Sequence, residues 1–243
     1  MTHAELLRTH DVTAGYGQGQ VLHGVDLNVG AGETVGLLGR NGAGRSTLLK
    51  AIMRLVRGSG SVTMAGSEIG KAPTHTITRC GIAYVPEDRG IFPDLTVREN
   101  LAVGKRGRNF HGYEDCAGPA WSEDEFLEMF PNLKRRANTH GGVLSGGEQQ
   151  MLTICRALMG QPRLILVDEP TEGLSLSMVD QVATLLREVA RRGVAILLVE
   201  QKLTIALQLC DRVNVMGHGR IVFDGTVAQF ESDPRVRANW LEV

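Results

Sequence analysis

The sequence lacks any apolar run long enough to cross a lipid bilayer. Its longest uninterrupted apolar stretch runs from Val194 to Val199, whereas a membrane-spanning helix needs roughly 18 residues. The first ten residues, MTHAELLRTH, contain no apolar core of the kind that secretory signal peptides have. Any association with a membrane is therefore expected to depend on a partner protein.

The chain also has few cysteines and a net charge close to zero. Four cysteines, Cys80, Cys116, Cys155 and Cys210, lie too far apart for a zinc site or a compact disulfide framework, so reduced thiols in a cytosolic protein are expected. The 26 Lys and Arg nearly balance the 27 Asp and Glu, which leaves a net charge of −1. Such a chain has no field that would attract a polyanion, and nucleic acid is not an expected partner.

Apolar and amphipathic stretches alternate along the chain, which is typical of an α/β domain. A length of 243 residues with 42% hydrophobic content is sufficient for one domain with a buried core. Continuous apolar runs predict strands covered on both faces at 34–39, 164–167 and 194–199, and alternation with period two predicts a half-buried strand at 21–29. The expected fold is a largely parallel sheet flanked by helices.

Apolar residues with helical spacing predict two helices beside these strands. The first carries Leu48, Leu49, Ile52, Met53 and Val56 on one face, and the second carries Val179, Val182, Leu185, Leu186 and Val189 and ends before Gly193. A hairpin is predicted over 213–223. The stretch from about 88 to 143 is richer in charge and glycine and is helical from Ser122 onward, which indicates a helical subdomain inserted into the core.

A glycine-rich loop joins the strand at 34–39 to the first helix. Its residues follow the pattern G-x-x-x-x-G-R-S-T and are Gly39, Arg40, Asn41, Gly42, Ala43, Gly44, Arg45, Ser46 and Thr47. Glycines let backbone N–H groups converge on phosphate oxygens, and the helix N-terminus adds a partial positive charge. The loop therefore predicts a nucleotide-phosphate site, and an ordinary glycine-rich turn is the alternative.

Arginine stands where this loop usually has lysine. The planar fork of Arg45 is bulkier and directed differently from an ammonium group, so the exchange is not conservative at a phosphate. Nucleotide binding is expected to survive it. A subunit that binds nucleotide but hydrolyses it poorly is the alternative that this residue leaves open.

A second anion site is predicted at LSGGEQQ, residues 144–150. Ser145 and Glu148 have the spacing of a capping box, and they precede a helix that carries Met151, Leu152, Ile154, Cys155 and Leu158. Capping boxes are common. The two glycines, Gly146 and Gly147, and the position shortly before the acidic pair Asp168 and Glu169 make this motif specific.

With these motifs the chain resembles the ATP-binding subunits of ABC transporters, from Tyr16 to about Gly225. The resemblance implies an α/β P-loop NTPase fold of RecA type, with an N-terminal antiparallel β subdomain and an inserted helical signature subdomain. It implies one ABC ATPase domain over 1–243, with the nucleotide-binding core at 1–87 and 160–243 and the helical part at about 88–159. It also implies two subunits that bind head to tail and share two ATP sites.

The same resemblance assigns roles to individual residues. Tyr16 would stack on adenine, a buried core tyrosine being the alternative. Ser46 and Asp168 would hold Mg²⁺, because this cation prefers oxygen ligands. Glu169 would be the general base that activates water, and the residues from Ser145 to Glu148 would bind the nucleotide of the partner subunit.

Three departures from the commonest ABC pattern narrow the resemblance. The chain has Glu87 where a loop glutamine senses Mg²⁺, Gln201 where a histidine contacts the γ phosphate, and Ser175 where an aspartate is usual. With these three residues the chain resembles the ATP-binding subunits of branched-chain amino acid importers, a subgroup that includes urea and amide importers. The resemblance implies that the chain binds integral membrane permease subunits on the cytoplasmic face of the membrane. It also implies, indirectly, a periplasmic solute-binding protein.

Other functions stay open at this point. A non-transport ABC ATPase would usually carry two nucleotide domains or a long coiled-coil insertion, and an exporter motor would fit Glu87 and Gln201 less well. The transported solute is determined by other subunits. The sequence also leaves open whether the ATP-binding pair is a homodimer or a heterodimer.

Overall fold

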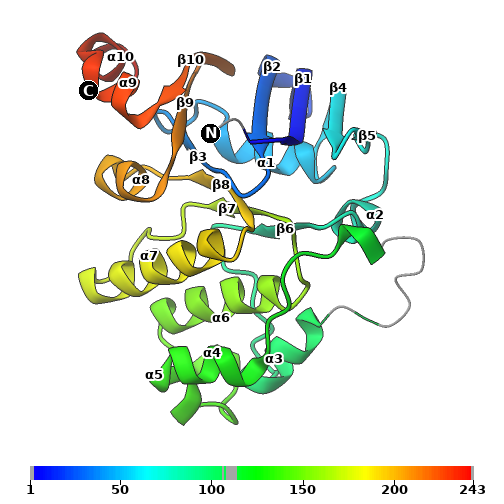
Figure 1. Ribbon diagram of the computed structural model, residues 1–243, viewed down its shortest axis with the longest axis vertical. Coiled ribbons are helices and arrows are strands. Elements are labelled where there is room, and N and C mark those ends of the chain that lie inside the picture. The colour runs from blue at the N-terminus through cyan, green and yellow to red at the C-terminus, as the bar shows by residue number, and fades with distance from the viewer. Residues whose placement is uncertain (1–2, 106, 108–113, 242–243) are drawn as a thin grey trace.

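The computed structural model describes residues 3–105, 107 and 114–241. Its strands form two sheets, and helices lie on both sides of the larger sheet (Figure 1). In the described part of the chain, no helix is both long and apolar enough to span a membrane. The strands are β1 Glu5–Tyr16, β2 Gly19–Gly30, β3 Thr34–Leu38, β4 Arg57–Met64, β5 Ser67–Glu68, β6 Ile82–Val85, β7 Leu164–Asp168, β8 Ala195–Val199, β9 Arg212–Gly217 and β10 Arg220–Thr226. The helices are α1 Arg45–Ile52, α2 Thr74–Arg79, α3 Val97–Gly104, α4 Glu123–Met129, α5 Pro131–Arg135, α6 Gly146–Leu158, α7 Leu176–Arg191, α8 Leu203–Leu209, α9 Val227–Ser232 and α10 Pro234–Trp240, with short 3-10 turns at Glu114–Cys116 and Gly141–Val143.

The larger sheet has six strands in the order β10-β9-β3-β8-β7-β6. All neighbours run parallel except β10 and β9, which form the predicted hairpin. Every residue of β3, β7 and β8 is buried, as their continuous apolar sequences predict. The smaller sheet is antiparallel, in the order β2-β1-β4-β5. The predicted α/β fold with an antiparallel N-terminal sheet is confirmed.

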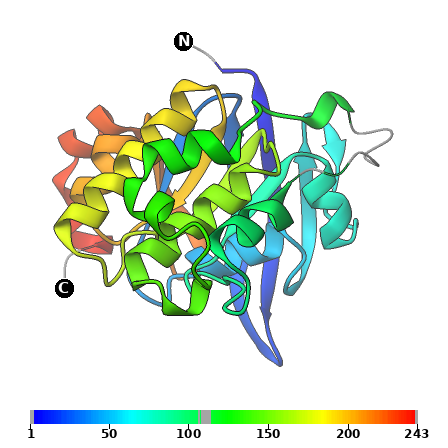
Figure 2. The same cartoon turned by 90° about the horizontal axis from the view of Figure 1, so that it is seen from below.

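Two hydrophobic cores lie on opposite faces of the six-stranded sheet. Alternate strand residues supply them: Leu166 and Leu197 pack with α1 and the antiparallel sheet, whereas Val167 and Leu198 pack with α6, α7 and the helices beyond. Helix α1 therefore lies between the two sheets, with Leu48 and Leu49 fully buried. In both views the antiparallel sheet and the C-terminal helices lie on opposite sides of the molecule (Figure 2).

Helix α1 is shorter than its apolar pattern predicts. It ends at Ile52, so Val56 lies outside it, and the prediction was wrong on this point. The N–H of Leu55 bonds the carbonyl of Lys50 at 2.8 Å and that of Arg54 bonds Ala51 at 3.0 Å. Arg54 has the left-handed φ of 58°. These bonds form a Schellman motif, which stops the helix without the glycine that usually signals it.

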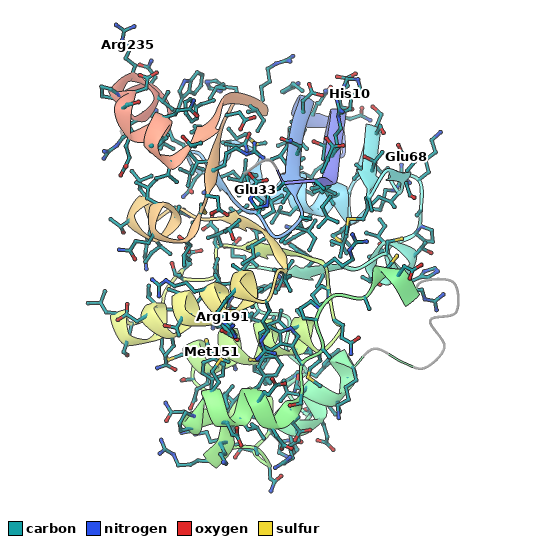
Figure 3. All side chains as sticks on the ribbon, in the orientation of Figure 1. His10, Glu33, Glu68, Met151, Arg191 and Arg235 are labelled. Atoms are coloured by element: carbon teal, nitrogen blue, oxygen red, sulfur yellow. The ribbon has the colours of Figure 1, made fainter. Side chains whose placement is uncertain are left out.

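Glu33 ties the two sheets together in the turn between β2 and β3 (Figure 3). Its carboxylate accepts hydrogen bonds from the Arg212 Nε on β9, at 2.8 Å, and from the Gly30 N–H at the end of β2, at 2.7 Å. A charged bond of this kind is directional as well as favourable. It links the end of β2 in the antiparallel sheet to β9 in the larger sheet.

The helices from α3 to α6 lie together on one side of the larger sheet, at the bottom of Figure 1. Leu101, Phe126, Leu133 and Leu152 join them to the core under the sheet. Helix α4 begins after Ser122, where the predicted helical stretch starts, and α6 begins after the predicted capping box at Ser145; Ser122 forms a capping box as well. The limits of a helical subdomain at about 88 and 159 stay a prediction.

A cluster of charged residues connects the end of α7 to this helical part. The Arg192 guanidinium lies 3.8 Å from the centre of the Trp121 ring and donates to Glu188 at 2.9 Å and to Glu125 on α4 at 3.0 Å. Hydrogen bonds from Arg191 and Arg192 lower the pKa of Glu188 from its ordinary 4.5 to about 2.

Glu188→Gln is expected to lower the free energy of unfolding at pH 7 by about 1 kcal/mol, the value of a well-formed but partly exposed ion pair. Because folding lowers the Glu188 pKa, its stabilisation is complete above pH 4.5 and is lost as the pH falls towards 2. Urea unfolding at several pH values measures both effects. Glu231→Gln, at an exposed position of α9, is the control, and an equal loss in both variants would contradict the prediction.

Candidate nucleotide site

Three neighbouring strands end at one cavity. The glycine-rich loop follows β3, Glu169 follows β7 and Gln201 comes shortly after β8, and in the sheet β3 lies beside β8 and β8 beside β7. The carboxyl ends of parallel strands form the edge where ligands bind in such sheets. The cavity there measures about 410 Å³ and is lined by Val21, Asn41, Gly42, Gly44, Arg45, Ser46, Thr47, Glu87, Glu169, Glu172 and Gln201.

The backbone of the glycine-rich loop requires its glycines. Gly39, Gly42 and Gly44 have φ values of 156°, 81° and 107°, which other residues rarely adopt. A Cβ on Gly39 would also lie 2.5 Å from the carbonyl oxygen of Met216. No side chain caps α1, so its first N–H groups point to the loop without an intrahelical acceptor. This arrangement fits the phosphates of a nucleotide.

Arg45 does not point into solvent. Its side chain is 4% exposed and forms an ion pair with Glu169, with 2.8 Å between Nη2 and Oε1. The same nitrogen donates to Asn41 Oδ1 at 3.2 Å, and Nη1 donates to the backbone carbonyl of Glu200 at 3.0 Å. The guanidinium therefore joins the loops that follow all three strands.

Ser46 and Asp168, two of the three residues expected at the Mg²⁺ site with Glu87, are in direct contact. Ser46 Oγ donates to Asp168 Oδ1 at 2.9 Å, and the Tyr84 hydroxyl donates to Asp168 Oδ2 at 3.2 Å. Burial raises the Asp168 pKa above its ordinary value, although these two hydrogen bonds oppose the shift. A nearby cation would stabilise the charged carboxylate, so the pair fits a magnesium ligand set.

Glu169 occupies an unusual backbone conformation. Its φ is 46°, in the left-handed region, and its N–H donates to the carbonyl of Val199 at 2.9 Å. Non-glycine residues in that region carry strain, which is common at functional sites. Burial raises the Glu169 pKa, against the charge of Arg45 and a hydrogen bond from Gln201. A raised pKa brings a carboxylate closer to the range suited to a general base.

Glu87 lines the same cavity as the glycine-rich loop. Burial and the charges of Glu172 and Asp168 raise its pKa. In the described residues, no group of three or more His, Cys, Asp or Glu side chains could hold a metal ion on its own. Magnesium is usually bound by one or two carboxylates with phosphates and water, and Ser46, Asp168 and Glu87 supply oxygens for such a site.

The signature motif, LSGGEQQ at 144–150, lies apart from this cavity. The Ser145 hydroxyl donates to Glu148 Oε2 at 2.8 Å, and the Ser145 N–H donates to the same oxygen. Gly147 packs so closely on α7 that an added Cβ would lie 2.7 Å from Met178 Cγ. None of the residues from Ser145 to Glu148 lines the cavity.

Tyr16 is an exposed residue. It ends β1 with 52% of its surface accessible, so the alternative of a buried core tyrosine is wrong. The ring is available for stacking against a flat partner.

The sequence model of the ABC transporter family matches residues 22–172. A high-affinity branched-chain amino acid transport ATP-binding protein, BraG of Pseudomonas aeruginosa, is 43% identical, with 97% of this chain and 99% of that protein covered.

The chain belongs to the ABC transporter family.

As an ABC protein it is an ATP-binding subunit and an ATPase. The lipopolysaccharide export system ATP-binding protein LptB of Haemophilus influenzae is 32% identical, with 97% of each chain covered. Among solved structures, a nucleotide-free ATP-binding cassette from an ABC transporter superposes with a TM-score of 0.79 at 27% identity, covering 96% of this chain and 97% of that one. A dimeric, post-hydrolysis cassette bound to ADP and phosphate superposes at 0.76 with 26% identity, covering 91% and 99%.

Three residues that were not among the predicted site residues make contacts at this candidate site. Tyr84 contacts Asp168, and Glu172 lines the cavity. Glu200 is buried and accepts hydrogen bonds from the Thr171 hydroxyl at 2.6 Å and from the Thr171 N–H at 3.2 Å. Glu200 thus holds the loop after Glu169. Its place at the end of a fully apolar strand was the available signal, since polar residues at such ends face ligands.

Proposed function

We propose that this chain hydrolyses ATP to energise import of branched-chain amino acids or related small polar solutes such as urea and amides. The observation that carries the proposal is the 43% identity to BraG over 97% of the chain. The presence of Glu87, Ser175 and Gln201 supports the same subgroup. The similarity to LptB also keeps an export system as a second candidate.

In this proposal the cavity binds ATP with Mg²⁺. The loop from Gly39 to Thr47 holds the phosphates, and Ser46, Asp168 and Glu87 supply the oxygen ligands of the cation, which neutralises charge on the phosphates. Glu169 accepts the proton of the attacking water, and Gln201 orients Glu169 through a hydrogen bond of 2.5 Å. Tyr16 stacks on the adenine.

A second ATP-binding subunit completes each site. The N-terminus of α6, with Ser145, Gly146, Gly147 and Glu148, is a phosphate site outside the cavity of its own chain. Head-to-tail pairing with the same chain or a related one would bring it to the partner's nucleotide. A solved cassette at 26% identity that is dimeric supports the formation of a pair.

A groove beside α3, α6 and β6 fits a membrane partner. It measures about 430 Å³ and is lined by Thr78, Ile82, Ala83, Tyr84, Phe92, Val103, Gly104, Lys105, Thr153, Arg156, Ala157, Gly160 and Pro162. Phe92 and Val103 are 45% and 55% exposed there, as apolar groups at protein interfaces are. The chain would bind permease subunits at this groove, on the cytoplasmic face of the membrane, and these would receive solute from a periplasmic binding protein.

The loop from Glu87 to Phe92 connects the groove to both phosphate sites. Glu87 lines the nucleotide cavity. The backbone oxygen of Arg89 accepts from Thr153 on α6 at 2.6 Å, and a Cβ on Gly146 would lie 2.8 Å from the Arg89 guanidinium. A change at the nucleotide can therefore reach the groove through packed groups.

Uptake of radiolabelled solutes by cells that lack the encoding gene tests the proposal. Loss of leucine, isoleucine and valine uptake is expected, with restoration by the intact gene and none by the Glu169→Gln variant. Loss of urea or amide uptake alone would select the related solutes. Unchanged uptake together with a defective outer envelope would favour an export system, and neither defect would favour a non-transport ABC ATPase.

A further inference from the structure

Two residues that distinguish this chain from the commoner ABC pattern contact one carboxylate. Glu169 Oε1 accepts from Arg45 Nη2 at 2.8 Å, and Oε2 accepts from Gln201 Nε2 at 2.5 Å. Each oxygen of the proposed base thus has a donor from a different loop. The exchanges at 45 and 201 are therefore connected through Glu169.

The geometry at Arg45 depends on the forked shape of its side chain. One terminal nitrogen is anchored on the Glu200 carbonyl while the other bonds Glu169 and Asn41. A lysine would present its donors on a single atom and could not span these positions in the same way. The arginine is therefore suited to hold Glu169 as well as a phosphate.

The ion pair between Arg45 and Glu169 is buried, so breaking it is costly. The side chains of Arg45 and Glu169 are 4% and 8% exposed. Removing one member of a buried pair leaves an uncompensated charge, which is strongly unfavourable unless another partner replaces it. Arg45 lies in the phosphate-binding loop, directly before Ser46, so a nucleotide phosphate is the anion that can replace the carboxylate.

We infer that Arg45 exchanges its bond to Glu169 for a bond to a nucleotide phosphate, and that this exchange frees Glu169 to accept a proton from water. Gln201 keeps its bond to Oε2 and holds the carboxylate in place during the exchange. Arg45 is thus a positioning residue that couples the base to an occupied phosphate site. The inference rests on the role proposed above for Glu169 and is independent of which solute is transported.

Unfolding of the purified protein without added nucleotide tests the ion pair directly. Urea unfolding is measured for the unmodified protein, Arg45→Met, Glu169→Gln and the double variant. A coupling of about tenfold in the unfolding equilibrium constant is expected for a buried contact pair. Additive effects of the two substitutions would overturn the inference, and this outcome does not depend on ATP hydrolysis or transport.

Affinity for a non-hydrolysable ATP analogue tests the exchange. Glu169→Gln removes the competing carboxylate charge and is expected to tighten binding about tenfold, whereas the matched variant Glu172→Gln, at the same cavity but without an ion pair to Arg45, changes it much less. Calorimetry at low protein concentration measures both. Equal effects of the two substitutions would show only a general charge effect and would overturn the exchange. Both variants conserve side-chain volume, so this arm remains decisive if Arg45→Met does not fold.

Discussion

Glu169→Gln is expected to slow ATP turnover by about 10²- to 10⁴-fold, the range that general-base catalysis contributes. Glutamine has the shape of glutamate but cannot accept the proton of the attacking water at neutral pH. Nucleotide binding is not lost, because the loop from Gly39 to Thr47 does not change, and it should be tighter because the carboxylate charge that competes for Arg45 is removed. Phosphate release by the chain together with its membrane subunits measures turnover.

The surroundings of Glu169 explain why the loss should be large. The residue has a φ of 46° in the loop that Glu200 and Thr171 anchor, and its two carboxylate oxygens accept hydrogen bonds from Arg45 and Gln201. Glu231→Gln, on the exposed face of α9, is the control and should hydrolyse ATP at the normal rate. Turnover by Glu169→Gln close to that of the control would assign water activation to another group.

Ser145→Ala is expected to reduce ATP turnover by about 10²-fold, a loss comparable to removing one donor from a site that stabilises developing negative charge. The hydroxyl caps α6, and in the proposed dimer it also faces the nucleotide of the partner subunit. Removing the cap alone should lower the free energy of unfolding by about 1 kcal/mol.

A second capping box in the same chain serves as a control that separates the loss of turnover from the loss of stability. Ser122 caps α4 with the same chemistry, accepting from the Glu125 N–H at 3.2 Å, and lies outside the nucleotide cavity and the signature motif. Ser122→Ala should therefore lose similar stability but keep its turnover. If both variants hydrolyse ATP equally well, the Ser145 hydroxyl is only a cap. Urea unfolding and phosphate release on each variant distinguish these results.

Local patterns predicted most of the elements that build the site. The buried strands β3, β7 and β8 follow from continuous apolar runs, and the start of α6 follows from the serine and glutamate of its capping box. The end of α1 could not be predicted in this way. Arg54 adopts a left-handed conformation that arginine rarely takes, and its hydrogen bonds stop the helix before Val56.

Some parts of the candidate site could also be predicted from local motifs, and others could not. Glycine spacing, LSGGEQQ and the acidic pair at 168 and 169 identified its parts, because each part is contiguous in the chain. The contacts of Tyr84 with Asp168 and of Glu200 with Thr171 could not be predicted, because they join segments that are far apart in sequence.

By itself, the sequence determined the α/β fold and the ABC family and predicted the residues of the candidate phosphate site, because periodicity and short motifs are local properties of the chain. Only the tertiary structure decided where Arg45 points and what Gln201 contacts. Both residues meet Glu169 because the parallel order of β3, β8 and β7 brings three separate loops to one edge of the sheet. A buried charge needs an opposite charge close to it. Arg45 and Glu169 come close to each other only when the chain folds.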